Sequence, residues 1–422
     1  MSHRGELLML VHRIPYPPDK GDKIRSFNEL RFLVDQGWRV HLCALADDPA
    51  DLPYKAELAK FCESLSIEPI NPKLQKLKSV TGPLLGLPMS AGYFYRRKLQ
   101  RRVDEILASR PISAVLCYCS PMAEYLRRSS CFSFEQSKRN GIFCLMDLVD
   151  VDSDKWDQYA QRSSGLLRWV YRLEGKLLYR YECRVSEWFD AVVLVSAAEA
   201  AVFSHRVGAQ RNIHGIGNGV DLDYFHPGQE KDENSGRRIC FCGAMGYFPN
   251  IDAVIWFARE VLPRVRSALG DVEFWIVGGG AGEEVLALGH LPGVHITGRV
   301  DDVRPYVWNS ELAVAPIRIA RGIQNKVLEA MALGTVTLAT PQAFEGLEAV
   351  AGEDLAVSPA EPAAFAAAAI ELLSKPEQRI EMARRARRLM EADYSWQARL
   401  QLLDELLGGL PKSSSSTPEV LQ

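Results

Sequence analysis

Short apolar runs alternate with stretches of helical periodicity along most of the chain. The first half has apolar runs at residues 7–11, 40–45, 114–118, 142–147 and 191–196, and a helical pattern at residues 24–37. The second half has apolar runs at residues 239–242, 272–277, 294–297, 312–315 and 336–339, and helical patterns at residues 250–269 and 325–333. Such alternation is typical of parallel strands joined by helices. We therefore predict an α/β fold of two Rossmann-like, doubly wound domains that face a central cleft.

Two polar stretches near the middle of the chain separate the predicted domains. Residues 215–228 are rich in Gly, Asn, Asp and Pro, and residues 229–238 are polar or charged apart from one glycine. We place the first domain at residues 1–215, the linker at 216–237 and the second domain at 238–376. Helices at residues 377–410 are expected to cross back toward the first domain. The small polar residues at 411–422 predict a disordered tail.

The composition is that of an ordinary globular protein. The chain has 422 residues, a formal net charge of −3 and 24% charged residues, which argues against a disordered or nucleic-acid-coating protein. No apolar stretch reaches the roughly 18 residues that a membrane span needs. The nine cysteines and eight histidines lack metal-ligand spacing, so we expect buried thiols and no metal site. We expect a cytoplasmic protein, and leave open a peripheral position on the inner face of the cell membrane.

The loops that follow the predicted strands are the first places to look for a binding site. Gly21 stands in the loop after the first strand, where a ligand could approach the backbone closely and Lys20, Lys23 and Arg25 could meet an anion. Gly278 and Gly279 follow a strand of the second domain but lack the spacing of a dinucleotide fingerprint. We interpret these two glycines as a turn that faces the cleft and contacts a nucleotide.

Residues 316–341 combine the features that an anionic ligand needs. The backbone amides of Gly322, Ile323 and Gln324 stand at the start of a predicted helix, where the partial positive charge favours phosphate. Arg321 and Lys326 add full charges. One helical turn beyond Asn325, Glu329 could accept hydrogen bonds from a ribose diol. The alternative is a surface helix with a Lys326–Glu329 ion pair.

This stretch resembles the donor-binding helix of family 4 glycosyltransferases, which have the two-domain GT-B fold. Residues 218–221 (NGVD) and 394–396 (YSW) are similar to the domain-junction and closing-helix motifs of that family. The opening segment and residues 147–156 and 241–250 resemble the sugar transferases associated with PEP-CTERM/exosortase systems. The resemblance implies that the first domain faces the acceptor and the second binds the nucleotide sugar. It also implies that Glu329 binds ribose.

The sequence departs from the family pattern at three places. Arg321 replaces the first carboxylate of the family's Glu-x7-Glu pattern, and Ala244 and either Pro249 or Asn250 stand where the family has diphosphate-clamping Arg and Lys residues. Arg321, Lys326 or Arg299 would then supply the missing charge. The loop at residues 147–153 lacks the histidine often found there, so we assign Asp150 and Asp152 to the acceptor side. With Arg321 they form the candidate catalytic set, and we interpret their resemblance to a metal-binding Asp-x-Asp as coincidence.

Taken with the resemblance, these features predict a retaining glycosyltransferase. It would move sugar from a nucleotide-diphosphate sugar to a glycan or polyprenyl-diphosphate-linked acceptor in exopolysaccharide biosynthesis, with no cofactor beyond that co-substrate. A nucleotide-sugar epimerase, a phosphorylase and a non-catalytic nucleotide-sugar-binding protein are the alternatives. A basic series from Arg168 to Arg184, beside Trp169, suggests an anionic membrane surface as a partner. Nucleic acid is not expected as a partner.

Overall fold

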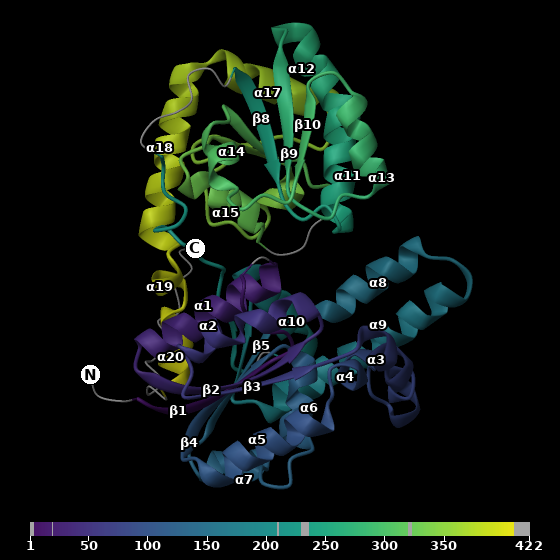
Figure 1. Ribbon diagram of the computed structural model, residues 1–422, viewed down its shortest axis with the longest axis vertical. Helices are drawn as coiled ribbons and strands as arrows, with labels where there is room; N and C mark the ends of the chain where they lie inside the picture. Colours follow the sequence, from purple (N-terminus) through teal and green to yellow (C-terminus); the bar gives the residue numbers. More distant parts are fainter. Residues whose placement is uncertain (1–3, 19, 209–210, 229–235, 320–322, 409–422) are drawn as a thin grey trace, which may run out of the picture. The chain divides into compact units, whose positions relative to one another are not determined.

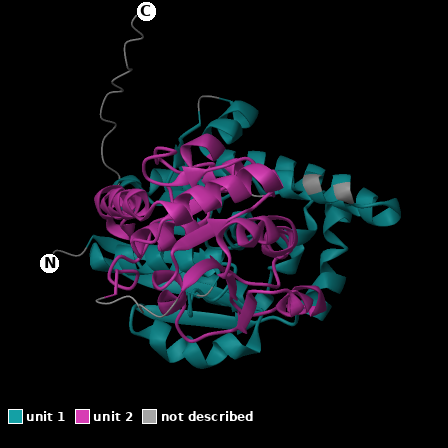
Figure 2. Cartoon of the chain, turned by 90° about the horizontal axis from the view of Figure 1, so that it is seen from above, with its two compact units in different colours: residues 1–194, 200–216, 400–422 teal, residues 195–199, 217–399 magenta. Residues whose placement is uncertain are grey.

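The computed structural model describes residues 4–18, 20–208, 211–228, 236–319 and 323–408, which form two compact units (Figure 1). The described residues of unit 1 fall within Met1–Leu194, Ala200–Ile216 and Leu400–Gln422. Those of unit 2 fall within Val195–Glu199 and Gly217–Arg399, as Figure 2 shows by colour. The chain therefore passes from unit 1 to unit 2 and returns to unit 1 near its end.

Unit 1 is built on a sheet with the strand order β3-β2-β1-β4-β5-β6-β7, in which every described pair is parallel. Residues 7–11 of the interior strand β1 are an unbroken, buried apolar run, because helices cover both faces of a parallel sheet of this kind. The strands are β1 (Gly5–Val11), β2 (Trp38–Ala46), β3 (Ser64–Pro69), β4 (Ile112–Tyr118), β5 (Phe143–Val149), β6 (Ala191–Leu194) and β7 (Ile213–Gly215).

The helices of unit 1 connect these strands, and α8 and α9 form a long antiparallel hairpin (Figure 1). Their bounds are α1 (Gly21–Asp35), α2 (Lys55–Ala59), α3 (Pro72–Ser79), α4 (Met89–Tyr93), α5 (Arg97–Ser109), α6 (Ala123–Arg127), α7 (Phe134–Arg139), α8 (Asp152–Arg162), α9 (Gly165–Trp188), α10 (Ala197–Val207) and α20 (Gln401–Leu407). The last of them, α20, is attached to the start of the unit: the buried carboxylate of Asp404 accepts a hydrogen bond from Trp38 Nε1 (2.9 Å) and pairs with Arg4 (2.8 Å).

Unit 2 repeats the design with the strand order β10-β9-β8-β11-β12-β13, again with parallel pairs. Its strands are β8 (Arg237–Cys242), β9 (Val272–Val277), β10 (Val294–Gly298), β11 (Leu312–Ala315), β12 (Thr337–Ala339) and β13 (Ala356–Val357). Its helices are α11 (Phe248–Trp256), α12 (Leu262–Leu269), α13 (Glu283–Leu286), α14 (Arg304–Trp308), α15 (Asn325–Ala332), α16 (Pro341–Phe344), α17 (Pro362–Ser374), α18 (Pro376–Asp393) and α19 (Trp396–Arg399).

The single helix predicted at residues 250–269 is divided in the structure. A π-helical turn, Phe257–Val261, separates α11 from α12. Pro263 follows at the start of α12, where it cannot donate a backbone hydrogen bond and its ring crowds the preceding turn. A widened turn accommodates the proline without ending the helical path.

Both sheets have a doubly wound strand order. In each, the chain first adds strands on one side of the strand that begins the sheet, β1 or β8, and then adds the remaining strands on its other side. The prediction of two Rossmann-like α/β domains is confirmed, and each predicted strand corresponds to an observed one. The sequence did not predict β3, β7 and β13, nor the helices of residues 49–109. In the described part of the chain, no helix is both long and apolar enough to cross a bilayer.

Candidate functional site

The carboxyl ends of β8 and β9 lie in direct backbone contact in unit 2. The amide of Gly243 donates to Val277 O at 2.9 Å, and Gly278 adopts a φ of 140°. A Cβ atom at Gly278 would collide with the carbonyl oxygen of Gly243, so only glycine fits there. A Cβ at Gly279 would approach Arg299 Cβ to 3.1 Å. The two predicted glycines thus form a close turn at the ligand-binding edge of the sheet.

Arg299 supplies a cation at this edge. It follows the last residue of β10 and its side chain is exposed. Among the described residues, no ion pair joins Arg299 to a carboxylate. A guanidinium without an acidic partner beside a glycine turn is suited to an anionic ligand.

Lys326 extends from α15 into the loop after β8. Its Nζ donates to Asn250 Oδ1 (3.1 Å) and to Gln324 Oε1 (3.3 Å), and lies 5.4 Å from the centre of the Phe241 ring. Asn250 is buried and is fixed in turn by its hydrogen bond to Ala244 O (2.9 Å). A lysine distant in sequence therefore brings positive charge to the loop that lacks a basic residue of its own.

Glu329 lies one turn after Lys326 on α15, and the surrounding protein shifts both pKa values although part of each side chain reaches solvent. Burial lowers the pKa of Lys326 to about 8, against the attraction of Glu329. Burial also raises the pKa of Glu329 to about 7, against the attraction of Lys326. The ammonium donates to the amide oxygens described above. Both groups can therefore change charge near neutral pH.

The motifs that resemble family signatures converge on the start of α15. Asn218 Nδ2 donates to Asn325 Oδ1 at 3.0 Å. A Cβ at Gly219 would lie 2.7 Å from Trp396 Cα, so these two motifs are in backbone contact. The side chain of Ile323 packs beside them, against the backbone of Gly217. The junction motif thus helps to fix the N-terminus of α15.

Two of the predicted site residues, Arg321 and Gly322, lie outside the described residues. The other predicted residues of unit 2 gather at one edge of its sheet: Asn250, Gly278, Gly279, Arg299, Ile323, Gln324, Asn325, Lys326 and Glu329.

Gly21 is the first residue of α1, exposed, with no atom within 4 Å of a Cβ placed there. The protein itself therefore imposes no requirement for glycine. The interpretation of Lys23 and Arg25 as cations for an anion is wrong, because both side chains are buried in ion pairs. Lys23 pairs with Asp51 (2.7 Å) and Arg25 with Asp147 (2.7 Å).

Asp150 and Asp152 share one ammonium group at the start of α8. Lys155 Nζ lies 2.7 Å from Asp150 Oδ2 and 2.9 Å from Asp152 Oδ1. Although burial opposes it, the two carboxylates raise the pKa of Lys155 well above its usual value. Val149, just before them, has a φ of 67°, which a β-branched residue rarely adopts. Across the described residues, no cluster of His, Cys, Asp and Glu has the arrangement to hold a metal ion.

His12 is a residue of unit 1 that the sequence analysis did not single out. It follows β1, is buried, stacks on Tyr118 (5.8 Å between ring centres) and has Nε2 3.3 Å from Asp22 Oδ2. Burial lowers its pKa, but Cys119 and Asp22 outweigh burial and raise that pKa to about 10. Its place directly after a predicted strand was the one signal available in the sequence.

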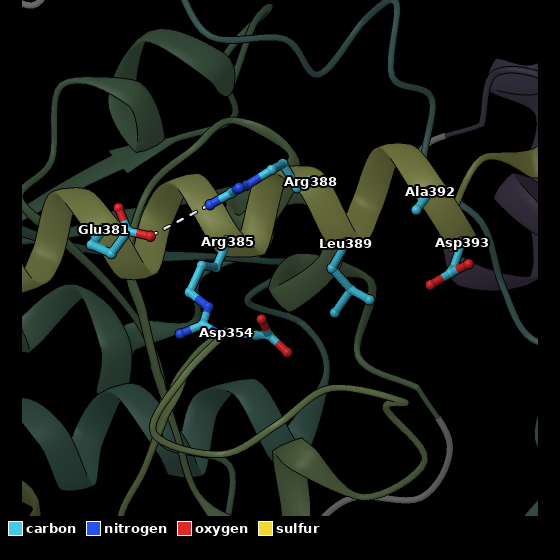
Figure 3. A pocket seen from close by; sticks show the side chains of 7 residues that line it. All are labelled: Asp354, Glu381, Arg385, Arg388, Leu389, Ala392 and Asp393. Atoms are coloured by element: carbon cyan, nitrogen blue, oxygen red, sulfur yellow. Dashed lines mark hydrogen bonds and ion pairs between the residues drawn. The ribbon is translucent and has the colours of Figure 1, made fainter.

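An open hollow of about 550 Å³ lies on α18, separate from these residues (Figure 3). Its charged groups are largely paired, with Arg388 near Glu381 (3.4 Å) and Arg385 near Glu353 (2.7 Å). None of the predicted site residues lines it. We therefore base the candidate site on the strand ends.

Comparison with known proteins adds a family match over one third of the chain and a fold. Residues 236–375 match the family model described as "Glycosyl transferases group 1". Curated protein sequences give no match. Three solved structures with similar folds are sucrose-phosphate synthase from Thermosynechococcus elongatus, HepE of Anabaena in complex with UDP, and WaaG, a glycosyltransferase involved in lipopolysaccharide biosynthesis.

The TM-scores of the three are 0.72, 0.64 and 0.65, at 15%, 13% and 14% sequence identity. The alignments cover 95%, 96% and 96% of this chain and 98%, 100% and 100% of the respective structures. At such identities the likeness establishes a shared two-domain fold of the GT-B type.

Proposed function

We propose that this chain uses a nucleotide-diphosphate sugar and retains the configuration of the anomeric carbon. The glycosyl transferases group 1 match and the GT-B fold support an enzyme of the glycosyltransferase type. The observation that carries the proposal is the cluster of Lys326, Glu329 and Asn250 beside the Gly278 turn. HepE, one of the proteins with a similar fold, was solved with UDP and with UDP-glucose. That likeness supports a nucleotide sugar as the donor.

The residues of unit 2 have the chemistry that such a donor requires. The ammonium of Lys326, the guanidinium of Arg299 and the positive end of α15 offset the charge of a diphosphate. As the sugar leaves, negative charge on the diphosphate grows, and cations already in place stabilise that charge without rearranging. Glu329, as a carboxylate, accepts hydrogen bonds from the two ribose hydroxyls. Catalysis in this proposal depends on positioning and electrostatics.

The acceptor side of the proposal rests on unit 1. We propose a glycan or polyprenyl-diphosphate-linked acceptor and a role in exopolysaccharide assembly in the PEP-CTERM/exosortase manner. The basic residues Arg168, Arg172, Lys176, Arg180 and Arg184 are all exposed on α9, which supports contact with an anionic membrane surface. Asp150 and Asp152 are proposed to face the acceptor through the loop after β5.

A thermal-shift panel of nucleoside diphosphates and their sugars tests the donor assignment. One nucleotide family should raise the melting temperature clearly more than the others, since binding to the native state stabilises it. Incubation of that sugar donor with and without glycan and lipid-linked acceptors then separates the reaction classes. Turnover to an isomeric nucleotide sugar without acceptor would indicate an epimerase, and binding without turnover a non-catalytic protein.

A further inference from the structure

The short helix α3 has an unusual orientation in unit 1, because its polar side chains face the protein and its leucines face solvent. Gln75 and Ser79 are buried, whereas Leu77 is 73% exposed and Leu74 46% exposed. Gln75 Nε2 donates to Tyr93 O (2.7 Å) and Tyr95 O (3.2 Å), which holds that face inward. The helix therefore presents apolar surface to water, which is unfavourable unless another surface covers it.

The exposed apolar surface continues beyond α3. Val80, directly after α3, is also exposed. The 3-10 helix η2 (Gly82–Leu85) adds Leu84 and Leu85, which are 86% and 74% exposed. The beginning of α9 adds Leu166, Leu167 and Trp169. These eight large apolar side chains come from two short segments of one unit: Leu74, Leu77, Val80, Leu84, Leu85, Leu166, Leu167 and Trp169.

The two segments are held together by a buried carboxylate. Glu174 of α9 accepts hydrogen bonds from the backbone amides of Met89 (2.6 Å) and Ser90 (3.0 Å) at the start of α4. α4 in turn packs on α3, since a Cβ at Gly92 would lie 3.3 Å from Ser79 Cα. Figure 1 shows α3, α4 and the α8–α9 hairpin along the same side of unit 1.

The charged residues of the two segments that carry these apolar side chains are all basic. No Asp or Glu occurs between Glu68 and Asp104, or between Asp157 and Glu174. Six exposed cations flank the leucines, and in the described part of the chain none of them forms an ion pair: Lys73, Lys76, Lys78, Arg168, Arg172 and Lys176. An apolar patch rimmed by unpaired cations matches a surface with phosphate headgroups above acyl chains.

Helix α9 contributes apolar surface mainly at its beginning. Leu177 is buried in unit 1 and Leu173 half-buried, whereas Leu166, Leu167 and Trp169 in the first two turns are exposed. The greater part of the exposed apolar surface belongs to α3 and η2.

We propose that α3, η2 and the first turns of α9 form a docking surface for an anionic lipid bilayer. The leucines enter the boundary between headgroups and acyl chains, and the six cations lie among the lipid phosphates. The inference rests on the proposed function only in choosing the bilayer that would carry a lipid-linked acceptor, because its evidence lies within unit 1. We refer to this surface as the α3–α9 patch.

Sedimentation with lipid vesicles tests the proposal on the full chain. The wild-type protein should bind vesicles of phosphatidylcholine mixed with phosphatidylglycerol, bind phosphatidylcholine alone far more weakly, and dissociate as salt increases. The triple variant Leu77→Gln, Leu84→Gln, Leu85→Gln should bind mixed vesicles about tenfold more weakly or worse. Its melting temperature should be preserved, because the three side chains have few partners to lose.

A control removes three exposed apolar residues from unit 2, each a little over half exposed: Leu286→Gln, Val350→Gln, Ile380→Gln. This variant should bind vesicles as the wild type does. A charge variant, Lys73→Gln, Lys76→Gln, Lys78→Gln, should lose mainly the preference for anionic lipid.

Three results would overturn the proposal: no binding of wild type to anionic vesicles, equal binding by the leucine variant, or self-association of wild type that the leucine variant abolishes. The last would assign the patch to a second copy of the chain. Nucleotide affinity is measured on the same preparations. Its absence with intact vesicle binding would refute the donor assignment alone, and its presence without vesicle binding would refute the docking surface alone.

Discussion

At the scale of single residues, Lys326 and Glu329 are charged groups whose environment favours neither charge. Burial moves the two pKa values toward each other, to about 8 and about 7. A folded protein tolerates such a pair where a ligand makes use of it, which is why perturbed pKa values cluster at functional sites. A bound diphosphate would favour the ammonium of Lys326, and a ribose diol would favour the carboxylate of Glu329.

Replacing Glu329 by alanine should weaken binding of the cognate nucleotide without weakening the fold. Two hydrogen bonds to a charged acceptor are lost, each contributing roughly 1.5–3 kcal/mol at most, and each 1.4 kcal/mol corresponds to about tenfold in affinity. Calorimetry should show this loss. The melting temperature of the free protein should be unchanged or higher, because the raised pKa means that the charged carboxylate does not favour the folded state.

The matched control for this change is Glu371→Ala, which removes an exposed carboxylate of unit 2 that pairs with Lys375. It should leave nucleotide affinity as in the wild type. If Glu329→Ala also left affinity unchanged, the donor site would have to be sought elsewhere.

Donor affinity should pass through a maximum between pH 7 and 8. The carboxylate of Glu329 forms as pH rises through about 7, and the ammonium of Lys326 is lost as pH rises through about 8. A nucleotide-diphosphate sugar is the proper probe, because its phosphodiester groups do not titrate in this range. Lys326→Arg should abolish the decline on the alkaline side, since an arginine stays charged. A flat profile for the wild type would contradict the assigned roles.

The sequence pointed to much of this candidate site because Gly278 directly follows a predicted strand and Glu329 lies on a predicted helix that follows another. It could not show that Lys326 reaches Asn250, 76 residues away, because that contact depends on the path of a side chain across two elements. Nor could it show that Lys23 and Arg25 are buried in ion pairs, since their partners come from other strands and loops.

At the scale of elements, the turn after β9 has its shape fixed by backbone contact. Gly278→Ala would force a Cβ onto Gly243 O and give alanine a φ of 140°, so it should destabilise unit 2 by more than about 1 kcal/mol. Gly282→Ala is the control, because nothing lies within 4 Å of its added Cβ and its φ is −80°. Urea titrations of both variants measure the difference. Equal urea midpoints for the two variants would show that the turn accommodates a methyl group at residue 278 without loss of stability.

Element type followed from periodicity for the predicted strands and for the helices predicted at residues 24–37 and 325–333. The π-helical turn before Pro263 has a local cause, because a proline inside a helical pattern disturbs the turn that precedes it. The orientation of α3 had no such signal. The amide nitrogen of Gln75 donates to two backbone carbonyls from the segment around α4, a tertiary arrangement that reverses the usual inward direction of leucines.

At the scale of the whole molecule, two doubly wound units each carry their polar loops at the carboxyl ends of their strands. The doubly wound α/β class was predictable because parallel βαβ connections allow few topologies. The division of the chain between the units was harder to derive, since contacts made by α20 and by residues 195–199 determine it.

Turnover should persist in excess chelator, because Lys326 and Arg299 can offset the charge of the leaving diphosphate. The measurement is donor consumption with a competent acceptor, before and after addition of EDTA. A variant with both cations neutralised, Lys326→Gln with Arg299→Gln, should lose activity under either condition. Complete loss by the wild type, reversed by magnesium or manganese, would reject the prediction.

The return of the chain to unit 1 also determines the order in which a newly made molecule can be completed. Arg4 and Trp38 leave the ribosome early, yet their partner Asp404 is synthesised only after the whole of unit 2. Domains generally fold as units during synthesis. Unit 2, whose residues are contiguous apart from a five-residue segment, can be finished first. The unit that begins the chain is therefore the last to reach its final form, and a ribosome that stops before α20 releases a protein with a mature second unit and an unfinished first one.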